Sequence, residues 1–211
     1  MIVLGIAGGS GCGKTTFVRA LMHALPGEDI AVIPQDAYYK DLSALSLQEK
    51  LSYNFDDPAA IDFDLLVEHV SSLRRGQEID QPVYDFLSCK RLDETVTVVP
   101  RPVLILEGIL VLTHAPLRAL LDLKLFMHLA ADQRLVQIVE RDIAERGRDA
   151  GEVLRRYLET VRPMHERYVE PSREYADLII PHGGHNAVAT SLISEFVRRK
   201  LHSPFSKPLP T

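Results

Sequence analysis

Apolar positions along the chain form two kinds of pattern: short, nearly uninterrupted runs, and longer stretches in which they recur every three to four residues. Short runs predict strands buried on both faces of a parallel sheet, and the recurring pattern predicts helices packed on that sheet. The predicted strands are Ile2–Ala7, Ala31–Pro34, Pro102–Leu112, Leu123–Leu129 and Asp177–Pro181. Strands and helices therefore alternate, which indicates an α/β fold with a parallel sheet.

Five stretches have helical spacing, and several of them have clear ends. The first carries Phe17 and Leu21 and stops at Pro26-Gly27, and the second has Asp62 as its cap and ends near Gly76. The predicted helices are 14–25, 62–76, 132–148, 151–169 with an interruption at Pro163, and a closing helix around 192–197. Proline is expected to kink the fourth helix because it lacks a backbone N–H.

The segment Ile79–Val99 has a different character from the rest of the chain. Two short β-prone runs flank a polar connection, which predicts a hairpin projecting from the sheet. Tyr84 and Phe86 lie on one face of such a strand, because strand side chains alternate. These rings either stack on a planar ligand or pack against the body of the protein, and the sequence leaves both possibilities open.

Composition limits the class of protein. The chain has 211 residues with a formal net charge of −5, which suits one domain at 1–202, followed by a proline-rich tail at 203–211. The acidic balance argues against a general nucleic-acid binder. No apolar run is long enough to span a membrane, and the amino-terminal run reads as a core strand rather than a signal peptide. Cys12 and Cys89 form no disulfide framework, so we expect a reduced, cytoplasmic protein.

The segment GGSGCGKTT follows the first predicted strand and opens the first predicted helix. It holds the pattern Gly-x₄-Gly-Lys-Thr, in which glycines expose backbone N–H groups to a phosphate, the lysine reaches the β- and γ-phosphates and the threonine hydroxyl ligates Mg²⁺. The predicted nucleotide contacts are Gly8, Gly9, Ser10, Gly11, Cys12, Gly13, Lys14, Thr15 and Thr16. The alternative is an ordinary glycine-rich turn between a strand and a helix.

Two acids lie in or next to predicted strands, and open α/β sheets bind their ligands at the carboxyl ends of the strands. Asp36 comes directly after the second strand and is a candidate for orienting and deprotonating an attacking hydroxyl; its alternative is a helix or turn cap. Glu107 interrupts the most apolar run, and we assign it to Mg²⁺ because a buried carboxylate needs a cation or donors. Asp56 and Asp57 are metal ligands, hydroxyl acceptors or turn residues, with turn chemistry favoured.

Arginines gather at the end of the helix predicted at 132–148. Arg141, Arg146 and Arg148 lie around Gly147, where a mobile helix end is able to swing over a triphosphate. A solvated charged face is the competing interpretation, and the sequence does not decide between them.

Taken together, these stretches resemble the uridine/cytidine kinases from about Ile2 to Val197. The motifs that carry the resemblance are, in order, GGSGCGKTT, QDAYYKD, NFDDP, PVYDF, ETVTV, LEGIL, RDIAERGRD, VRPMHERYVEPS and YADLIIP. The resemblance implies a P-loop kinase domain with a parallel five-stranded core, a nucleoside-site hairpin at 79–99 and an arginine-bearing lid at 132–150. It also implies ATP, or GTP, as phosphate donor, Mg²⁺, a small nucleoside as substrate and a homotetramer.

The same resemblance implies roles for individual residues. Asp36 is the expected acid-base residue at the nucleoside 5′-hydroxyl, assisted by Lys14 and the lid arginines. The expected metal site is Thr15, Glu107 and Asp36. The expected nucleoside contacts are Asp36, Tyr38, Asp56, Tyr84, Phe86, Cys89, Arg141, Arg148 and Arg156. The loop after Pro181 is expected near the adenine.

The chain departs from the family at the acceptor side. Cys89 stands where histidine is common, Gln137-Ile138 where arginines are usual, and Arg156 where glutamine is common. Two alternatives follow: a related kinase that acts on another small alcohol, and a nucleotide-binding regulator that has lost catalysis. Lys14, Asp36 and Arg148 are all present, which weighs against the regulator.

Overall fold

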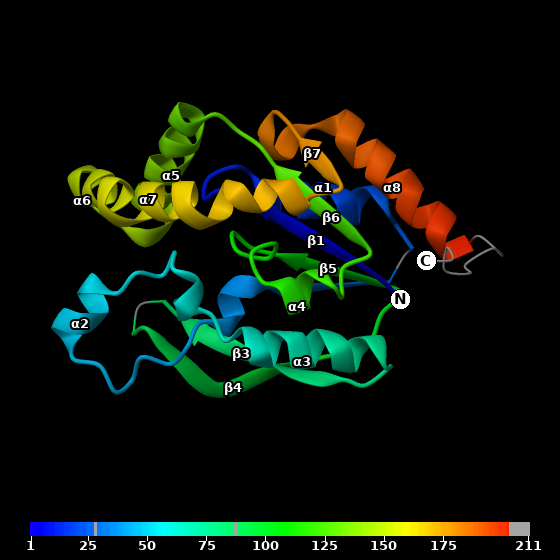
Figure 1. Ribbon diagram of the computed structural model, residues 1–211, viewed down its shortest axis with the longest axis horizontal. Helices are drawn as coiled ribbons and strands as arrows, with labels where there is room; N and C mark the ends of the chain where they lie inside the picture. Colours follow the sequence, from blue (N-terminus) through cyan, green and yellow to red (C-terminus); the bar gives the residue numbers. More distant parts are fainter. Residues whose placement is uncertain (28, 87, 203–211) are drawn as a thin grey trace.

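Five parallel strands form the centre of the protein, in the order β2-β5-β1-β6-β7 (Figure 1). The computed structural model describes residues 1–27, 29–86 and 88–202. The strands are β1 (Ile2–Gly8), β2 (Ile30–Pro34), β5 (Val103–Glu107), β6 (Leu123–Met127) and β7 (Leu178–Ile180). This confirms the predicted parallel α/β sheet and its five strands.

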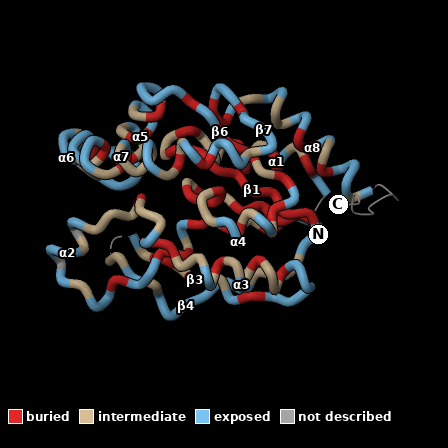
Figure 2. Tube along the Cα trace, in the orientation of Figure 1, coloured by how far each residue is buried: buried red, intermediate tan, exposed pale blue. Residues whose placement is uncertain are grey.

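Helices cover both faces of the sheet and divide the core into two layers. On one face, Phe17 of α1 (Lys14–Ala24) and Val197 of α8 (Ala187–His202) pack against strand residues such as Ile105. On the other face, Leu66 of α3 (Phe63–Arg74) packs with residues such as Leu104, and the short α4 (Ala115–Arg118) joins them. Figure 2 shows the buried trace concentrated along the strands between these layers.

An antiparallel hairpin lies beside α3 and outside the main sheet (Figure 1). It consists of β3 (Ile79–Asp85) and β4 (Lys90–Val98), and its register shifts between Pro82 and Tyr84. A bulge of this kind re-aims the side chains that follow it. The predicted hairpin is therefore confirmed, and its tip lies next to the α2 (Leu47–Ser52) segment, because Lys50 donates a hydrogen bond to the carbonyl of Ser88.

The carboxyl-side helices form a separate layer above the sheet. Helix α5 (Ala131–Arg146) ends at Gly147, which has a left-handed backbone at φ 62. Next come α6 (Ala150–Arg156) and α7 (Arg162–Met164). A wide π-type turn at Tyr157–Val161 lies between these two helices, and a second one at His165–Val169 follows α7. Pro163 has no N–H to donate, and the wider turns on both sides of it change the pattern of helical hydrogen bonds. The irregularity lies where the sequence predicted an interruption of the helix.

The strand predicted at 102–112 is longer than the strand in the structure. Strand β5 ends at Glu107, and the apolar residues after it form a turn because Gly108 brings the backbone against Gln35. A Cβ on Gly108 would lie 2.4 Å from the Cβ of Gln35. Glu107 therefore ends the strand instead of interrupting it. The strand predicted at 123–129 likewise ends earlier, at Met127.

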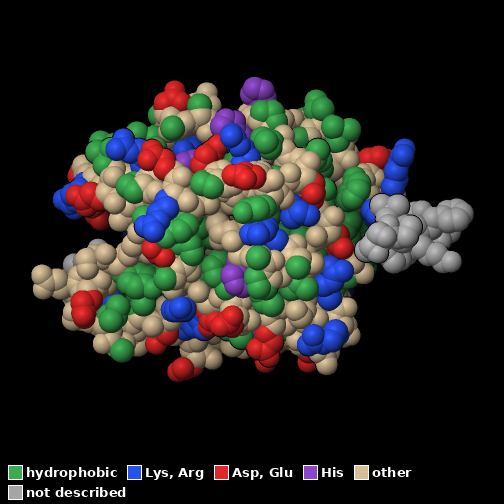
Figure 3. Space-filling view, in the orientation of Figure 1, with side chains coloured by type: hydrophobic (Ala, Val, Ile, Leu, Met, Phe, Trp, Pro, Cys, Tyr) green, Lys and Arg blue, Asp and Glu red, His purple; other side chains and the backbone are tan. Residues whose placement is uncertain are grey.

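None of the helices in the described part of the chain is long and apolar enough to cross a membrane. The tail predicted at 203–211 lies outside the described residues. The molecular face in Figure 3 carries basic and acidic side chains scattered among apolar ones, with no single-sign region.

Candidate functional site

The phosphate-binding loop joins β1 to α1. Lys14 folds back over it and donates hydrogen bonds from Nζ to the carbonyls of Gly8 and Gly9, at 3.0 and 3.2 Å. Gly13 takes a left-handed φ of 86 at the helix start, and no side chain caps α1. The first N–H groups of the helix therefore point outward, with the positive end of the helix dipole, which is an arrangement that binds phosphate.

Thr15 and Glu107 meet across the loop, although they are far apart in the sequence. The Thr15 hydroxyl donates to the Glu107 carboxylate at 3.1 and 3.3 Å from its two oxygens. Burial raises the pKa of Glu107, while Lys14 and the hydrogen bond from Thr15 act in the opposite direction. The pair presents hard oxygen donors next to the loop, and Mg²⁺ is typically held by one or two carboxylates together with substrate phosphates.

Asp36 lies on the short 3₁₀ turn Gln35–Tyr38, directly after β2. Water reaches its surface, but protein atoms surround the carboxylate, and this desolvation raises its pKa; the charges of Lys14, Arg146 and Arg141 lower it in part. The phosphate-loop lysine and two arginines of α5 therefore both act on this carboxylate. The strands that carry Asp36 and Glu107 are neighbours, with Pro34 paired to Glu107. The sequence-predicted acid therefore lies at the expected edge of the sheet, not at a helix cap.

The lid arginines converge on one carboxylate that the sequence analysis did not single out. Arg141, Arg146 and Arg148 all contact Asp142, whose side chain is almost fully buried. The guanidinium of Arg146 also lies over the ring of Phe86, 5.9 Å from its centroid, and the charges of Arg146 and Arg141 lower the pKa of Asp36. A solvated charged face does not describe these three side chains.

Asp56 is buried beside the cleft and lacks a hydrogen-bond partner for its Oδ2 among the described residues. Its pKa is raised by burial, and Asp36 raises it further, while Arg156 at 4.0 Å lowers it. Asp57, by contrast, accepts from the N–H of Ala59 and is a turn residue. An unpaired buried carboxylate is costly, so Asp56 is suited to accept hydroxyl groups from a ligand.

Four aromatic rings form a cluster around Tyr39. Tyr39 is in edge or tilted contact with Phe55, Tyr84 and Phe86, at 5.2, 5.4 and 5.9 Å between ring centroids. Phe86 is 48% exposed, so this hairpin ring is free to contact a ligand, whereas Tyr84 packs in the cluster. The sequence left stacking and packing open for this pair; Tyr84 packs, and stacking by Phe86 on a ligand stays a prediction.

The prediction that Tyr38 contacts the substrate is wrong for this conformation. Tyr38 is fully buried, and its hydroxyl lies 2.9 Å from Nδ1 of His69. Its neighbour Tyr39 instead faces Asp36 and Asp56, both of which raise its pKa in addition to the effect of burial. Successive side chains on a 3₁₀ turn point about 120° apart. Two adjacent tyrosines therefore point in different directions, and the sequence does not indicate which of them points toward Asp36.

Arg91 ties the hairpin to the segment that carries Asp36. Its guanidinium donates to the carbonyls of Tyr39 and Tyr38 at 2.8 and 3.2 Å and pairs with Asp62 at 3.1 Å. Nothing in the local sequence around Arg91 indicates that this residue joins the hairpin to the Tyr38–Tyr39 backbone. Cys89, at the hairpin end, has a strained left-handed φ of 54, and its Sγ lies 3.7 Å from the carbonyl of Phe86.

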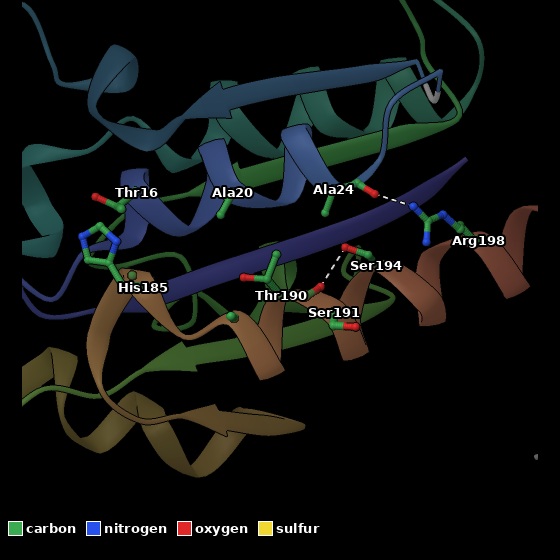
Figure 4. A pocket seen from close by; sticks show the side chains of 10 residues that line it. Thr16, Ala20, Ala24, His185, Thr190, Ser191, Ser194 and Arg198 are labelled. Carbon is green, nitrogen blue, oxygen red and sulfur yellow. Dashed lines mark hydrogen bonds between the residues drawn. The ribbon is translucent and has the colours of Figure 1, made fainter.

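A groove of about 380 Å³ runs between α1 and α8 (Figure 4). It starts at Thr16 and His185, next to the phosphate loop, and extends past the small side chains of Ala20 and Ala24. At the far end Arg198 donates to the carbonyl of Ala24. The loop after Pro181 therefore borders a hollow continuous with the phosphate loop, as expected for the base of a nucleotide donor.

Comparisons with known proteins agree with this geometry. Residues 3–189 match the model of the phosphoribulokinase/uridine kinase family. A uridine kinase of Halalkalibacterium halodurans is 48% identical over 197 residues, 93% of each chain, and one of Bacillus subtilis is 48% identical over 192 residues, 91% of each. A putative fructose transport system kinase from Silicibacter sp. shares the fold at a TM-score of 0.72 and 22% identity, covering 85% of this chain and 89% of that one. Phosphoribulokinase from Rhodobacter spheroides aligns at a TM-score of 0.62 and 16% identity, covering 85% of this chain and 69% of that one.

Proposed function

The chain belongs to the phosphoribulokinase/uridine kinase family, and we propose that it transfers the γ-phosphoryl group of ATP to the 5′-hydroxyl of uridine, cytidine or both. The observation that carries this proposal is that Asp36 follows the end of β2, whose last residue pairs with Glu107, and that Glu107 accepts a hydrogen bond from Thr15 of the phosphate loop. The charges of Lys14, Arg146 and Arg141 lower the pKa of Asp36 in part. A polyphosphate in the loop and an alcohol beside Asp36 would meet at this edge of the sheet.

In the proposed reaction the nucleoside oxygen attacks the γ-phosphorus, and the bond from that phosphorus to the β-phosphate oxygen breaks. Asp36 orients the hydroxyl and accepts its proton. Charge spreads over the equatorial oxygens in a loose transition state, so the residues that matter are those that position and neutralise. Lys14 and Arg141, Arg146 and Arg148 supply this positive field, and backbone N–H groups from Gly9 to Thr16 hold the remaining phosphate oxygens.

Thr15 and Glu107 would hold a Mg²⁺ ion, and we propose Asp36 as a third oxygen donor. When bound, the ion would neutralise charge on the β- and γ-phosphates. Mg²⁺ in such sites is typically held by one or two carboxylates together with substrate phosphates, which the Thr15–Glu107 pair would match.

We propose that the nucleoside lies between the hairpin and Asp56. The unpaired Oδ2 of Asp56 would accept the ribose hydroxyls, with Arg156 on the other side of them, and Phe86 and Tyr39 would contact the base. The adenine of ATP, or the guanine of GTP, would enter the groove that starts at Thr16.

The direct test is product analysis. The purified chain, given Mg²⁺, ATP and uridine or cytidine, is expected to form ADP and a nucleoside 5′-monophosphate in equal amounts, identified by phosphorus NMR. ATP binding without nucleoside-dependent ADP would point to a regulator that has lost catalysis.

A second candidate is phosphorylation of another small alcohol, which Cys89 and Arg156 favour because they change the acceptor contacts and leave the phosphate side intact. A panel of ribonucleosides, modified nucleosides and sugar phosphates compared by kcat/KM separates the two functions. A preference for an acceptor without a pyrimidine would replace uridine and cytidine in the proposal.

Cys89→His is expected to change the ratio of kcat/KM for uridine to that for cytidine. Imidazole donates and accepts hydrogen bonds, whereas the thiol does so weakly, so the edge of the base would be read differently. A change of about threefold or more corresponds to part of one hydrogen bond. Cys89→Ser is the comparison for losing the thiol without gaining an imidazole. A constant ratio would mean that the hairpin does not contact the base edge.

The acidic limb of the pH profile for kcat/KM of the nucleoside is expected above the ordinary aspartate pKa of 3.8, because desolvation raises the pKa of Asp36. The base must be ionised, so activity falls as the pH drops through this raised pKa. Arg146→Met removes a charge that lowers the pKa of Asp36, so the limb should move to higher pH. Arg156→Gln, whose charge acts on Asp56, should leave it in place. The opposite pattern would assign the limb to Asp56.

We also propose a reducing compartment such as the cytoplasm and a homo-oligomeric state. Both cysteines are free, which supports the first. Val188 and Leu192 on α8 are 71% and 66% exposed, which supports a surface covered by a second copy. Light scattering of the purified chain measures the assembly directly.

A further inference from the structure

Asp142, near the end of α5, is the point where the lid arginines meet. Its side chain is 3% exposed. Oδ1 accepts from Arg141 at 2.9 and 2.8 Å and lies 3.2 Å from Arg146, and Oδ2 accepts from Arg148 at 3.0 Å. One carboxylate therefore holds three guanidinium groups that come from three different positions around a helix end.

The backbone of Asp142 fixes the same turn. Its carbonyl accepts the N–H of Gly147 and, at 3.1 Å, that of Arg148. Gly147 has a left-handed φ of 62 that permits the chain to turn back. The turn brings Arg148 to the carboxylate, so side-chain and main-chain contacts of one residue define where this arginine lies.

The electrostatics show why a carboxylate is needed here. Burial alone would raise the pKa of Asp142, but the hydrogen bond from Arg141 and the charges of the three arginines outweigh it and lower the pKa. Burial and Arg141 both lower the pKa of Arg146, whereas Asp142 raises it. Like charges this close repel, and without an anion between them the three groups would separate.

The cluster lies next to the hairpin ring of the proposed nucleoside site, because the Arg146 guanidinium is 5.9 Å from the centroid of the Phe86 ring. Arg141 and Arg146 both lower the pKa of Asp36, which the proposed reaction places at the attacking hydroxyl. The arginines are thus held on the side where a γ-phosphate would lie, even though Asp142 itself is buried behind them.

We propose that Asp142 is a positioning residue that gathers Arg141, Arg146 and Arg148 into one anion-binding group for the triphosphate. The inference rests on the proposed phosphoryl transfer. Asp142 does not touch the substrate; it acts through the arginines by holding their guanidinium groups close together before the nucleotide arrives. Such preorganisation favours the transition state more than the ground state, because charge on the equatorial oxygens develops only as the reaction proceeds.

The test compares Asp142→Asn, Asp142→Glu and, as a charge-matched control on the same helix, the exposed Glu145→Gln. Asp142→Asn is expected to lower kcat by about ten- to a hundredfold, with KM for ATP changing by less than about threefold, since misplaced donors cost turnover more than ground-state binding. Glutamate keeps the charge and should recover part of the loss. Glu145→Gln should match the wild type. Circular dichroism and thermal unfolding establish that each variant is folded at the assay temperature.

A double-mutant cycle tests whether Asp142 acts through the lid. In an Arg148→Met background, Asp142→Asn should cost less than it does in the wild type, because one of the groups that it positions is already gone. Equal costs in the two backgrounds would overturn the proposal. So would an unchanged kcat in a folded Asp142→Asn, or a faster enzyme, which would mean that Asp142 withholds the arginines instead of positioning them. An inactive wild type would remove the proposed function itself, so the two failures are distinct.

Discussion

Asp36→Asn is expected to lower kcat for nucleoside phosphorylation by about two or more orders of magnitude, the usual scale for loss of a general base, and to leave ATP binding nearly unchanged. The amide keeps the size of the side chain but cannot accept the proton of the 5′-hydroxyl. ATP binding should persist because the phosphate loop, formed around Lys14 and the start of α1, does not depend on this carboxylate.

Single-turnover kinetics with saturating ATP measures the chemical step, and calorimetric titration with ATP measures binding. Asp93→Asn, an exposed acid on β4, is the matched control and should behave as the wild type. If Asp36→Asn phosphorylated uridine at the normal rate, Asp36 would have no part in proton transfer. If it lost ATP affinity instead, its carboxylate would belong to the nucleotide side.

Lys14→Met is expected to lower kcat/KM for ATP by about 10³-fold, because it removes a full positive charge that the preorganised loop aims at the β- and γ-phosphates. The ammonium group already lies over the loop, 3.0 Å from the carbonyl of Gly8, so no rearrangement is needed for it to meet a phosphate. Methionine keeps most of the length and apolar volume of the side chain, so α1 should remain packed.

Steady-state kinetics at varied ATP gives kcat/KM, and equilibrium titration with the nucleoside alone reports the other half of the site, which should be little changed. Lys200→Met, at an exposed position of α8, controls for the loss of a lysine. Wild-type kcat/KM in Lys14→Met would mean that the loop binds something other than the transferring phosphates.

The sheet and the phosphate loop were predictable because their signals are local. Apolar runs mark the strands, and the spacing of the glycines and Lys14 within nine residues carries its own chemistry. The position of Asp36 was predictable for a related reason, since the carboxyl ends of parallel strands meet at one edge. The position of Glu107 was not, because the apolar residues after it extended the predicted strand to Leu112.

The contacts that complete the site were not predictable in this way. Arg91 contacts the carbonyl of Tyr39, 52 positions away in the sequence, and neither residue type suggests the other. Tyr38 and Tyr39 are chemically identical, and only the geometry of the 3₁₀ turn decides which of them faces the cleft. Asp142 looks like one more acid on a charged helix until its three partners are placed around it.

Strand order separates two kinds of residue in this protein. The phosphate loop, Asp36 and Glu107 follow β1, β2 and β5, which are hydrogen-bonded neighbours, whereas Phe86 and Cys89 belong to a hairpin outside that sheet. In the proposed function, the residues of phosphoryl transfer therefore lie on the central sheet, and residues that contact the acceptor base lie on the hairpin outside it. Exchange of the hairpin, in evolution or in the laboratory, is therefore the expected route to phosphorylation of a new alcohol. A replacement hairpin would need to keep Arg91, which holds it against the segment that carries Asp36.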